Sequence, residues 1–309
     1  MQRMDQPRTA LFLALAAAAI AATAATAAER SKVALTFDDM PAHGAMAPGR
    51  TRSQMTKEIV AALRAGKATA FGFVNAKTIE GTDAEDVLRV WREAGLPLGN
   101  HAFSHMDLHQ NTAEAFLADV AANEPVLERL MGKEDWHWFR FPYLNAGETP
   151  EKRRAVEAGL AQKGYRVAEV TIDFADWAYH DTYARCVAKG DTKSVGWLKK
   201  TYLEEASRSI EAARAESRAL YGREIAHVML LHLGDLNAVM TKPLLGLLRA
   251  RSFDVVPLAE AERDPAYAVR PAVAVPHGAS LFGQVRAERG LPDPPERPSV
   301  RQQIADLCK

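Results

Sequence analysis

Short apolar runs alternate with longer amphipathic stretches along the chain from residue 30 onward. Branched, aromatic and small apolar residues fill the short runs, which predicts strands buried on both faces. These expected strands are 32–37, 68–74, 96–100, 137–141, 165–172, 226–232 and 253–256. Helical spacing predicts helices at 52–65, 83–94, 112–131, 150–163 and 242–250. Strand–helix units that repeat in one direction indicate a parallel sheet with helical crossovers.

Two α/β architectures suit this pattern: an open doubly wound sheet and an incomplete (β/α) barrel. The pattern alone does not separate them. Residues 29–262 are expected to form this single domain, with a long insertion at 177–223 that contains a helical stretch at 194–220. Residues 263–309 are rich in proline and poorly periodic. They are expected to form an extension that wraps over the surface of the domain.

The N-terminus has the pattern of a secretory signal peptide. Arg3 and Arg8 lie in a short polar start, an apolar run follows at 11–25, and small residues lead up to Glu29. This order predicts a signal peptide over residues 1–28, with cleavage after residue 27 or 28. The mature protein would then be exported, periplasmic or secreted, without stable membrane insertion. An uncleaved membrane anchor is the alternative, because the apolar run is near the lower length limit for a span.

Charge and cysteine content narrow the range of partners. Lys+Arg and Asp+Glu both number 39, so the formal net charge is zero. Nucleic-acid-binding domains usually show a basic excess or stripe, so no nucleic-acid partner is expected. Cys186 and Cys308 have neither a CxxC neighbour nor a nearby histidine, which makes a thiolate metal site unexpected. A disulfide between them and two free thiols both remain open.

Ionisable residues follow five of the expected strands. In barrels and open α/β sheets, reactive groups collect at the carboxyl ends of the strands. The segments concerned are Asp38-Asp39, His101 to His105, Arg140 to Tyr143, Asp173 to Trp177, and His232. Five such endings exceed what chance supplies, so they predict a catalytic site at this end of the sheet.

The spacing of these residues suggests a metal site. His101 and His105 are four residues apart, which would place both imidazoles on one side of a helical turn. With a nearby carboxylate they would make a two-histidine, one-carboxylate set that leaves positions open for water and substrate. Asp38 and Asp39 would repel each other if both were buried without a cation. Consecutive strand residues point to opposite sides, so we expect these two carboxylates to have different roles.

The motifs TFDD, HxxxH, RFPY, DxxDW and LLH occur in this order between residues 32 and 257. In this respect the chain resembles the polysaccharide deacetylases of carbohydrate esterase family 4. The resemblance implies an α/β fold, a distorted, incomplete (β/α) barrel with about seven parallel strands. It also implies metal-dependent hydrolysis of N-acetyl or O-acetyl groups on a polysaccharide or cell-wall glycan.

The same resemblance implies roles for individual residues. A divalent metal, with zinc as the expected ion, would be bound by Asp39, His101 and His105. The catalytic group would consist of Asp38 as base, Arg140 holding that base, His232 as acid and Asp176 orienting the acid. The residues lining the site would be Tyr143, whose backbone N–H would face the oxyanion, with Trp177 and Leu230, the latter beside the acetyl methyl.

The chain departs from the family pattern at two positions: Ala102 replaces the usual hydroxyl residue after His101, and Leu233 replaces an aspartate after His232. The motifs assign no role to Asp173, and His43 is a weaker candidate for contact with substrate. Two alternatives remain open: an amidase acting on a small non-carbohydrate amide, and a catalytically inactive glycan-binding protein. The presence of both a base and an acid favours an enzyme, since a binding module could lose either.

Overall fold

The structure is a computed structural model that describes residues 30–309 except 80, 269, 275–276 and 296–297. The expected signal peptide, residues 1–28, lies outside the described residues. Seven parallel strands form one sheet: β1 (Ser31–Met40), β2 (Phe71–Val74), β3 (Leu98–Asn100), β4 (Trp138–Phe139), β5 (Arg166–Val167), β6 (His227–His232) and β7 (Phe253–Val255). Each overlaps one of the seven strands expected from the sequence.

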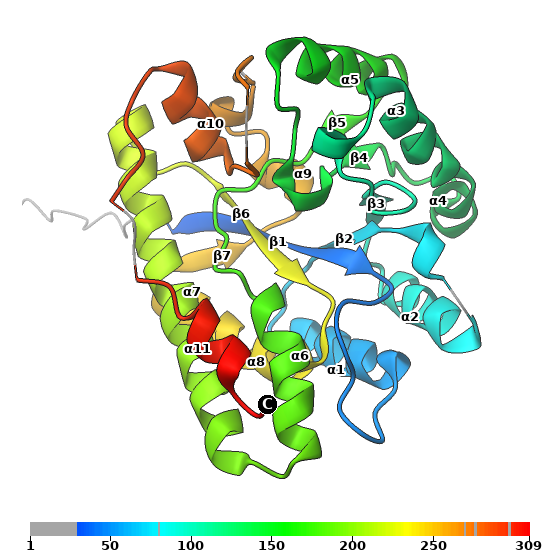
Figure 1. Cartoon of the computed structure of the whole chain (residues 1–309), viewed down its shortest axis with the longest axis vertical. Coiled ribbons are helices and arrows are strands. Elements are labelled where there is room, and N and C mark those ends of the chain that lie inside the picture. Colours follow the sequence, from blue (N-terminus) through cyan, green and yellow to red (C-terminus); the bar gives the residue numbers. More distant parts are fainter. Residues whose placement is uncertain (1–29, 80, 269, 275–276, 296–297) are drawn as a thin grey trace, which may run out of the picture.

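Strand β1 is the centre of the sheet, whose order is β5-β4-β3-β2-β1-β6 (Figure 1). Val33 of β1 pairs with His227 of β6 and also with Val255 of β7, so these two strands occupy opposite edges of β1. Strand β2 pairs with β1 further along, where Thr36 lies opposite Phe71. The long β1 therefore pairs with three strands, and its C-terminal end lies between β2 and β6.

The sheet curls into a nearly closed barrel. The segment after β5 reaches β6 through a parallel bridge between Ile172 and Met229. In this bridge Ile172 N donates to Val228 O at 3.0 Å, and Leu230 N donates to Ile172 O at 2.9 Å. The contact joins the two ends of the strand order, which decides for an incomplete (β/α) barrel over an open doubly wound sheet.

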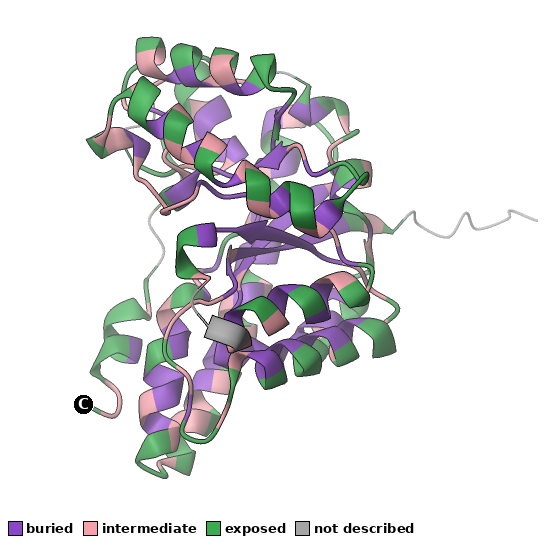
Figure 2. Ribbon diagram, turned by 90° about the vertical axis from the view of Figure 1, so that its right-hand side faces the viewer, coloured by how far each residue is buried: buried purple, intermediate pink, exposed green. Residues whose placement is uncertain are grey.

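Helices surround the curled sheet and bury their apolar sides against it (Figure 2). The barrel helices are α1 (Arg52–Ala65), α2 (Gly81–Glu93), α3 (Ala113–Ala122), α4 (Glu124–Met131), α5 (Pro150–Gln162) and α8 (Asp235–Ala250). Helix α1 has the expected bounds, and the hydroxyl of its N-cap Thr51 accepts a hydrogen bond from Gln54 N. The 3₁₀ turns are η1 (Ala76–Thr78), η2 (Leu108–Gln110), η3 (Pro142–Leu144) and η4 (Pro265–Tyr267).

One expected helix, 112–131, is in fact two. Helix α3 ends at Ala122 and α4 begins at Glu124, with Asn123 capping both, and Pro125 lies in the first turn of α4. Proline has no N–H and clashes with the preceding turn, which favours a break at this point. The buried Asn123 side chain donates to Val74 O at 2.6 Å and to Asn100 Oδ1 at 2.9 Å. The Asn123 side chain at this break therefore links the C-terminal ends of β2 and β3.

Two further boundaries differ from expectation. Strand β5 has two residues, where 165–172 was expected, because the rest of that segment crosses over to β6. Helix α8 begins at Asp235, seven residues before the expected start at 242. The buried Asp235 carboxylate accepts hydrogen bonds from Arg50 Nε at 2.7 Å and Ala47 N at 3.1 Å, which anchors this first turn.

The insertion and the C-terminal residues lie against the barrel. The insertion forms α6 (Trp177–Ala188) and the long α7 (Thr192–Tyr221), and the last residues form α9 (Leu258–Ala261), α10 (Leu281–Glu288) and α11 (Arg301–Asp306). Helix α10 packs on α7, and α11 packs on α6. A disulfide between Cys186 and Cys308 joins α6 to the residues after α11. Among the described residues, no helix is both long and apolar enough to cross a membrane.

Candidate active site

A pocket of about 500 Å³ opens at the C-terminal ends of the strands. Eight of the ten site residues expected from the sequence line it: Asp38, Asp39, His101, His105, Tyr143, Trp177, Leu230 and His232. The other two, Arg140 and Asp176, are buried behind it and contact lining residues. Further lining residues are His43, Phe141, Leu144, Asp173 and Gly278.

Both carboxylates of the Asp38-Asp39 pair face this pocket, so the expectation that they point to opposite sides is wrong. The reason is local backbone geometry. Asp39 has a φ of 58°, and the pairing register between β1 and β2 shifts between Phe37 and Met40. A left-handed residue interrupts the alternation of a strand, and for a non-glycine residue this conformation is costly. The left-handed conformation of Asp39 therefore turns its carboxylate into the same pocket as that of Asp38.

His101 and His105 also meet, although not on a helical turn as expected. They lie in an irregular loop after β3, in which Ala102 and His105 have φ values of 60° and 58°. Their ring centres are 4.9 Å apart. The Asn75 side chain donates to the Ala102 carbonyl at 2.9 Å, and Ala102 N donates to Asn100 Oδ1 at 2.9 Å. These contacts hold the loop that presents both imidazoles.

The orientation of His101 suits metal binding. His101 Nδ1 lies 2.8 Å from the Arg140 carbonyl, which only an N–H can approach as a donor. The lone pair of His101 is therefore on Nε2, which faces the pocket. Burial and the neighbouring His101 lower the pKa of His105 to about 4. His105 is thus neutral at pH 7, the form in which imidazole ligates a cation.

Asp39 completes a set of donors that fits a divalent cation. Its Oδ1 lies 3.4 Å from His101 Nε2 and 3.2 Å from His105 Nε2, yet this buried atom has no hydrogen-bond partner among the described residues. Two ligands that are each about 2.0–2.1 Å from a tetrahedral zinc ion are separated by roughly 3.3–3.4 Å. Burial raises the pKa of Asp39, but the neighbouring imidazoles of His101, His43 and His232 outweigh this effect and lower the pKa well below its ordinary value, so the carboxyl is ionised.

Arg140 holds the second carboxylate, Asp38. Both are almost fully buried, and Arg140 Nη1 lies 3.4 Å from each oxygen of Asp38. The rest of the guanidinium is fixed from other directions: Nε donates to Ala168 O at 2.8 Å, and Nη2 donates to Thr36 Oγ1 at 3.2 Å. A buried carboxylate needs such a partner to remain charged.

On the opposite wall, Asp176 orients His232. The fully buried Asp176 carboxylate lies 2.8 Å from His232 Nδ1, and its other oxygen accepts from His232 N and Asn237 Nδ2, both at 2.8 Å. Burial lowers the pKa of His232, but the charge and hydrogen bond of Asp176 outweigh this effect and raise it to about 9. His232 is accordingly an imidazolium at neutral pH.

Two exposed aromatic side chains and one buried leucine complete the lining of the pocket. Tyr143 and Trp177 are the exposed members, with 58% and 43% of their surface accessible, and Leu230 is buried in the wall. Tyr143 has a φ of 58° in η3, so its backbone is held in an uncommon conformation. Gly278 approaches the same turn so closely that a Cβ there would lie 1.9 Å from Tyr143 O.

Sequence reasoning misses two contributors to the site and ranks a third, His43, only as a weaker candidate. Gly278 comes from the C-terminal segment, and no motif pointed to it. Asn237 was missed because the start of its helix was placed too late. His43 was a weak candidate, but the structure places its Nδ1 2.7 Å from Asp39 Oδ2. The short distance in sequence between Asp39 and His43 was the available signal.

Comparison with known proteins agrees with this geometry. A polysaccharide deacetylase family model matches residues 25–168. A search of curated proteins found no match. The chitin deacetylase from the fungal pathogen Colletotrichum lindemuthianum is 18% identical, with a TM-score of 0.53 over 76% of this chain and 88% of the other.

Two further solved structures have similar folds. A family 4 carbohydrate esterase from Streptomyces lividans, solved with acetate, is 18% identical, with a TM-score of 0.50 over 76% of this chain and 97% of the other. A pseudoenzyme of the same family from Bacillus anthracis is 15% identical, with a TM-score of 0.50 over 75% of this chain and 65% of the other.

Residues 25–168, just under half of the chain, match the polysaccharide deacetylase family model, and the comparisons indicate a hydrolase of the class that removes amide-linked acetyl groups from glycans. The family-model match covers the Asp38, Asp39, His101, His105, Arg140 and Tyr143 positions. The match ends before Asp176 and His232, so the inclusion of these two residues in the site rests on their geometry alone.

Proposed function

We propose that this protein is an exported, metal-dependent deacetylase that hydrolyses N-acetyl or O-acetyl groups on a polysaccharide or cell-wall glycan. One observation carries the proposal: the unpaired buried Oδ1 of Asp39 faces two imidazole nitrogens at distances that suit a shared cation. A paired carboxylate and a paired imidazole line the same pocket. These are the parts that acetyl hydrolysis requires.

Asp39, His101 and His105 would hold the ion, with zinc expected from the mixed imidazole and carboxylate donors. What the ion supplies when bound is a more acidic water and a polarised acetyl carbonyl. Three protein ligands leave room for both water and substrate. A structural zinc site, in contrast, is usually closed by four protein ligands.

Asp38 is the proposed general base. Its carboxylate borders the metal-binding group, since Asp38 Oδ2 lies 3.6 Å from His101 Nε2. The Arg140 guanidinium holds this carboxylate in place, and a carboxylate can accept a proton from the attacking water. Arg140 is itself held by Thr36 and Ala168, so the guanidinium that faces Asp38 has a defined position.

His232 is the proposed general acid. The reaction needs a proton on the leaving nitrogen, and an imidazolium at neutral pH can donate it from Nε2. Asp176 favours the charged ring and binds Nδ1, so only Nε2 can face the substrate. Acid and base therefore differ in their required protonation, and each has a buried partner that favours the required form.

The remaining wall would position the acetyl group. The backbone N–H of Tyr143 is the proposed donor to the oxyanion, for which a preorganised donor is the general requirement. Leu230 would contact the acetyl methyl, and the exposed ring of Trp177 would lie against the sugar. Gly278 supports this arrangement by packing against the Tyr143 carbonyl.

The shape of the site favours a glycan over a small amide. A second pocket of about 510 Å³ adjoins the first, and the two share Leu144, Asp173 and Gly278 as lining residues. Its other walls come from α7 and from the C-terminal segment around α10, including the paired Glu216 and Arg286. Two adjoining pockets can take neighbouring sugars of an oligosaccharide chain, which a small amide does not have.

The inactive binding protein is the second candidate, because a pseudoenzyme has the same fold. Acetate release decides between the two. The purified mature chain is assayed on chitin oligomers, peptidoglycan and acetylated xylan, after zinc loading and after chelation. The proposal expects acetate from at least one glycan in the zinc-loaded sample and none after chelation. A chain that binds these glycans without ever releasing acetate would be a binding protein.

Export has its own test. The chain recovered from its native host should begin at residue 28 or 29 by mass spectrometry, since the N-terminal pattern predicts cleavage after residue 27 or 28. An intact residue 1 in a membrane fraction would instead establish the anchor. Both results are independent of the activity assay.

A further inference from the structure

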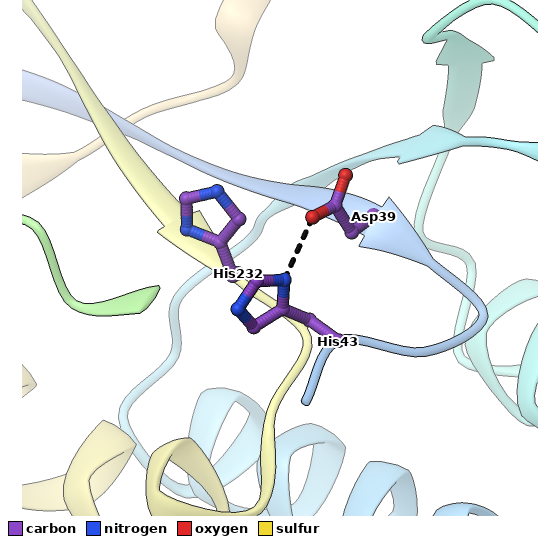
Figure 3. Close-up of side chains that lie close together, drawn as sticks. All are labelled: Asp39, His43 and His232. Carbon is purple, nitrogen blue, oxygen red and sulfur yellow. Dashed lines mark hydrogen bonds and ion pairs between the residues drawn. The ribbon is translucent and has the colours of Figure 1, made fainter. Parts of the chain in front are cut away.

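The two oxygens of the Asp39 carboxylate have different surroundings. Oδ1 faces His101 and His105, as described above, and makes no hydrogen bond. Oδ2 lies 2.7 Å from Nδ1 of His43, an interaction drawn in Figure 3. One carboxylate therefore meets three imidazoles, and the role of the third is not explained by the family motifs.

Distances separate the roles of these imidazoles. The 2.7 Å between His43 Nδ1 and Asp39 Oδ2 is a hydrogen-bond length, and short for an N–H donor, as expected when the acceptor is charged. Two ligands of one tetrahedral zinc ion lie roughly 3.3–3.4 Å apart, which matches His101 and His105 but not His43. His43 is accordingly a donor to Asp39, although Asp39, His43 and His232 also place donor atoms within 4.8 Å of one another.

His43 is itself held in place. His43 N donates to Leu233 O at 3.0 Å, so its loop is fastened to the residue after β6. Its ring centre lies 4.7 Å from that of His232 and 5.4 Å from that of the fully buried His180. Figure 3 shows the His43 ring between Asp39 and His232, below the ends of β1 and β6.

We infer that His43 is a positioning residue for the metal-binding carboxylate. By donating from Nδ1 to Oδ2, it fixes the rotation of Asp39 so that Oδ1 faces His101 and His105. Asp39 needs such a tether because its left-handed backbone conformation is otherwise unfavourable. Ligands of bound metals are commonly held by partners of this kind, whose removal typically lowers metal affinity about 10–100-fold. The inference rests on the metal site of the proposed function.

The test measures zinc affinity of the metal-free protein by competition with a chromogenic chelator, so it does not depend on activity. His43→Leu has a side chain of similar size but lacks the N–H that donates to Asp39 Oδ2. His43→Asn keeps an N–H donor at the position of Nδ1. We expect about 10–100-fold weaker zinc binding for His43→Leu and less than about 3-fold change for His43→Asn. His137→Ala, at a surface histidine that stacks on Trp136, should bind like the parent.

A second readout guards against misfolding. Zinc should raise the Tm of each variant by an amount that follows its measured affinity, whereas the metal-free Tm values should stay similar. Unchanged zinc affinity in His43→Leu would overturn the inference. So would loss of zinc in His43→Leu and His232→Ala together with retention in His101→Ala, because the ion would then be bound by His43.

The results also separate this inference from the proposed function. A parent that binds zinc with the expected dependence on His43 but releases no acetate refutes the activity and leaves the positioning role intact. A parent that releases acetate while His43→Leu binds zinc normally refutes only the positioning role. A parent that binds no divalent cation refutes both.

Discussion

Asp38 and His232 are register partners on the neighbouring parallel strands β1 and β6. The carboxylate and the imidazole therefore enter the pocket from the same level of the sheet, each with its own buried partner: Arg140 for Asp38 and Asp176 for His232. The hydrogen bonds of the sheet set their relative position. Neither group can shift along its strand without breaking the pairing that joins the two strands.

Substitution of the two adjacent aspartates should separate metal binding from turnover. Asp39→Asn should lose zinc, because the amide has no negative charge to hold the cation. Asp38→Asn should keep zinc and glycan binding but lose about 10²–10⁴-fold in kcat, since an amide cannot accept the proton of the water. Metal content, glycan binding and acetate release are measured on both variants. Full activity of Asp38→Asn would remove Asp38 from the mechanism.

The pH dependence of activity should report the His232–Asp176 pair. The acid must be protonated, and Asp176 raises the pKa of His232 to about 9, so activity should persist above neutral pH and fall when the ring loses its proton. In Asp176→Asn the pKa of His232 should drop, which moves the alkaline limb of kcat/KM to lower pH. The limb is measured at constant zinc occupancy. An unmoved alkaline limb in this variant would mean that another group is the acid.

Glu262 should make stability depend on pH away from the active site. Burial, followed by the nearby charge of Glu169, raises the pKa of Glu262 to about 8. A carboxyl whose pKa is raised by folding stabilises fully below its unfolded pKa, and this stability is lost as pH rises through the folded pKa. Stability should therefore fall between about pH 4.5 and pH 8.

Glu262→Gln removes that loss, so its Tm should exceed that of the parent at pH 8 by about 2–4 °C, for a gain of ~1 kcal/mol, and match it near pH 4.5. Glu260→Gln is the matched control, because Glu260 is a more exposed residue that pairs with Lys32 at 3.1 Å. Such surface pairs contribute little. Equal Tm differences at both pH values would argue against a raised pKa of Glu262.

The disulfide should contribute to stability without taking part in catalysis. It joins residues that are 122 positions apart, and a crosslink over so long a loop typically stabilises by about 2–5 kcal/mol. Urea unfolding with and without reductant should show this difference, while zinc binding at low urea stays unchanged. The unfolded, unreduced chain should have no titratable thiol. Two thiols in that experiment would show that Cys186 and Cys308 are unpaired.

A mutation in the adjoining pocket should distinguish long from short substrates. Ala215 is exposed on α7 and lines the pocket that adjoins the active site. Ala215→Trp should lower kcat/KM for a chitin tetramer about tenfold, through steric exclusion, and leave a small acetyl ester unaffected. Ala219→Trp places the same side chain one turn further along α7, at an exposed position that does not line that pocket, and should act like the parent. Equal effects of the two variants would exclude the adjoining pocket from glycan binding.

The sequence predicted all seven strands because each is a compact apolar run at the centre of the barrel. Boundaries failed where a polar residue found a buried partner that the sequence does not reveal. Asn123 ends α3 by bonding to the ends of β2 and β3, and Asp235 starts α8 early by binding Arg50. The closure of the barrel through Ile172 was likewise outside the reach of periodicity, since it is a single bridge between distant segments.

The chemistry of the site was predictable from motifs, but the geometry that assembles it was not. Periodicity placed Asp38 and Asp39 on opposite faces and the two histidines on a helix. The structure instead uses left-handed residues at Asp39, Ala102 and His105 to turn these side chains into one cavity. Such conformations are uncommon for non-glycine residues, so no local propensity indicates them. Gly278 was out of reach for another reason: it is contributed by a segment 135 residues after Tyr143 in the chain.

Arg140 serves the two halves of the site through different chemical groups: its side chain holds Asp38, whereas its main-chain carbonyl accepts from His101. Substitution can remove the first contact but not the second, because every amino acid retains the carbonyl. A change at this codon should therefore impair the proposed base, Asp38, and spare His101, which is proposed to bind the cation. In evolutionary terms, one missense mutation here would turn the proposed enzyme into a glycan-binding protein that keeps its cation site.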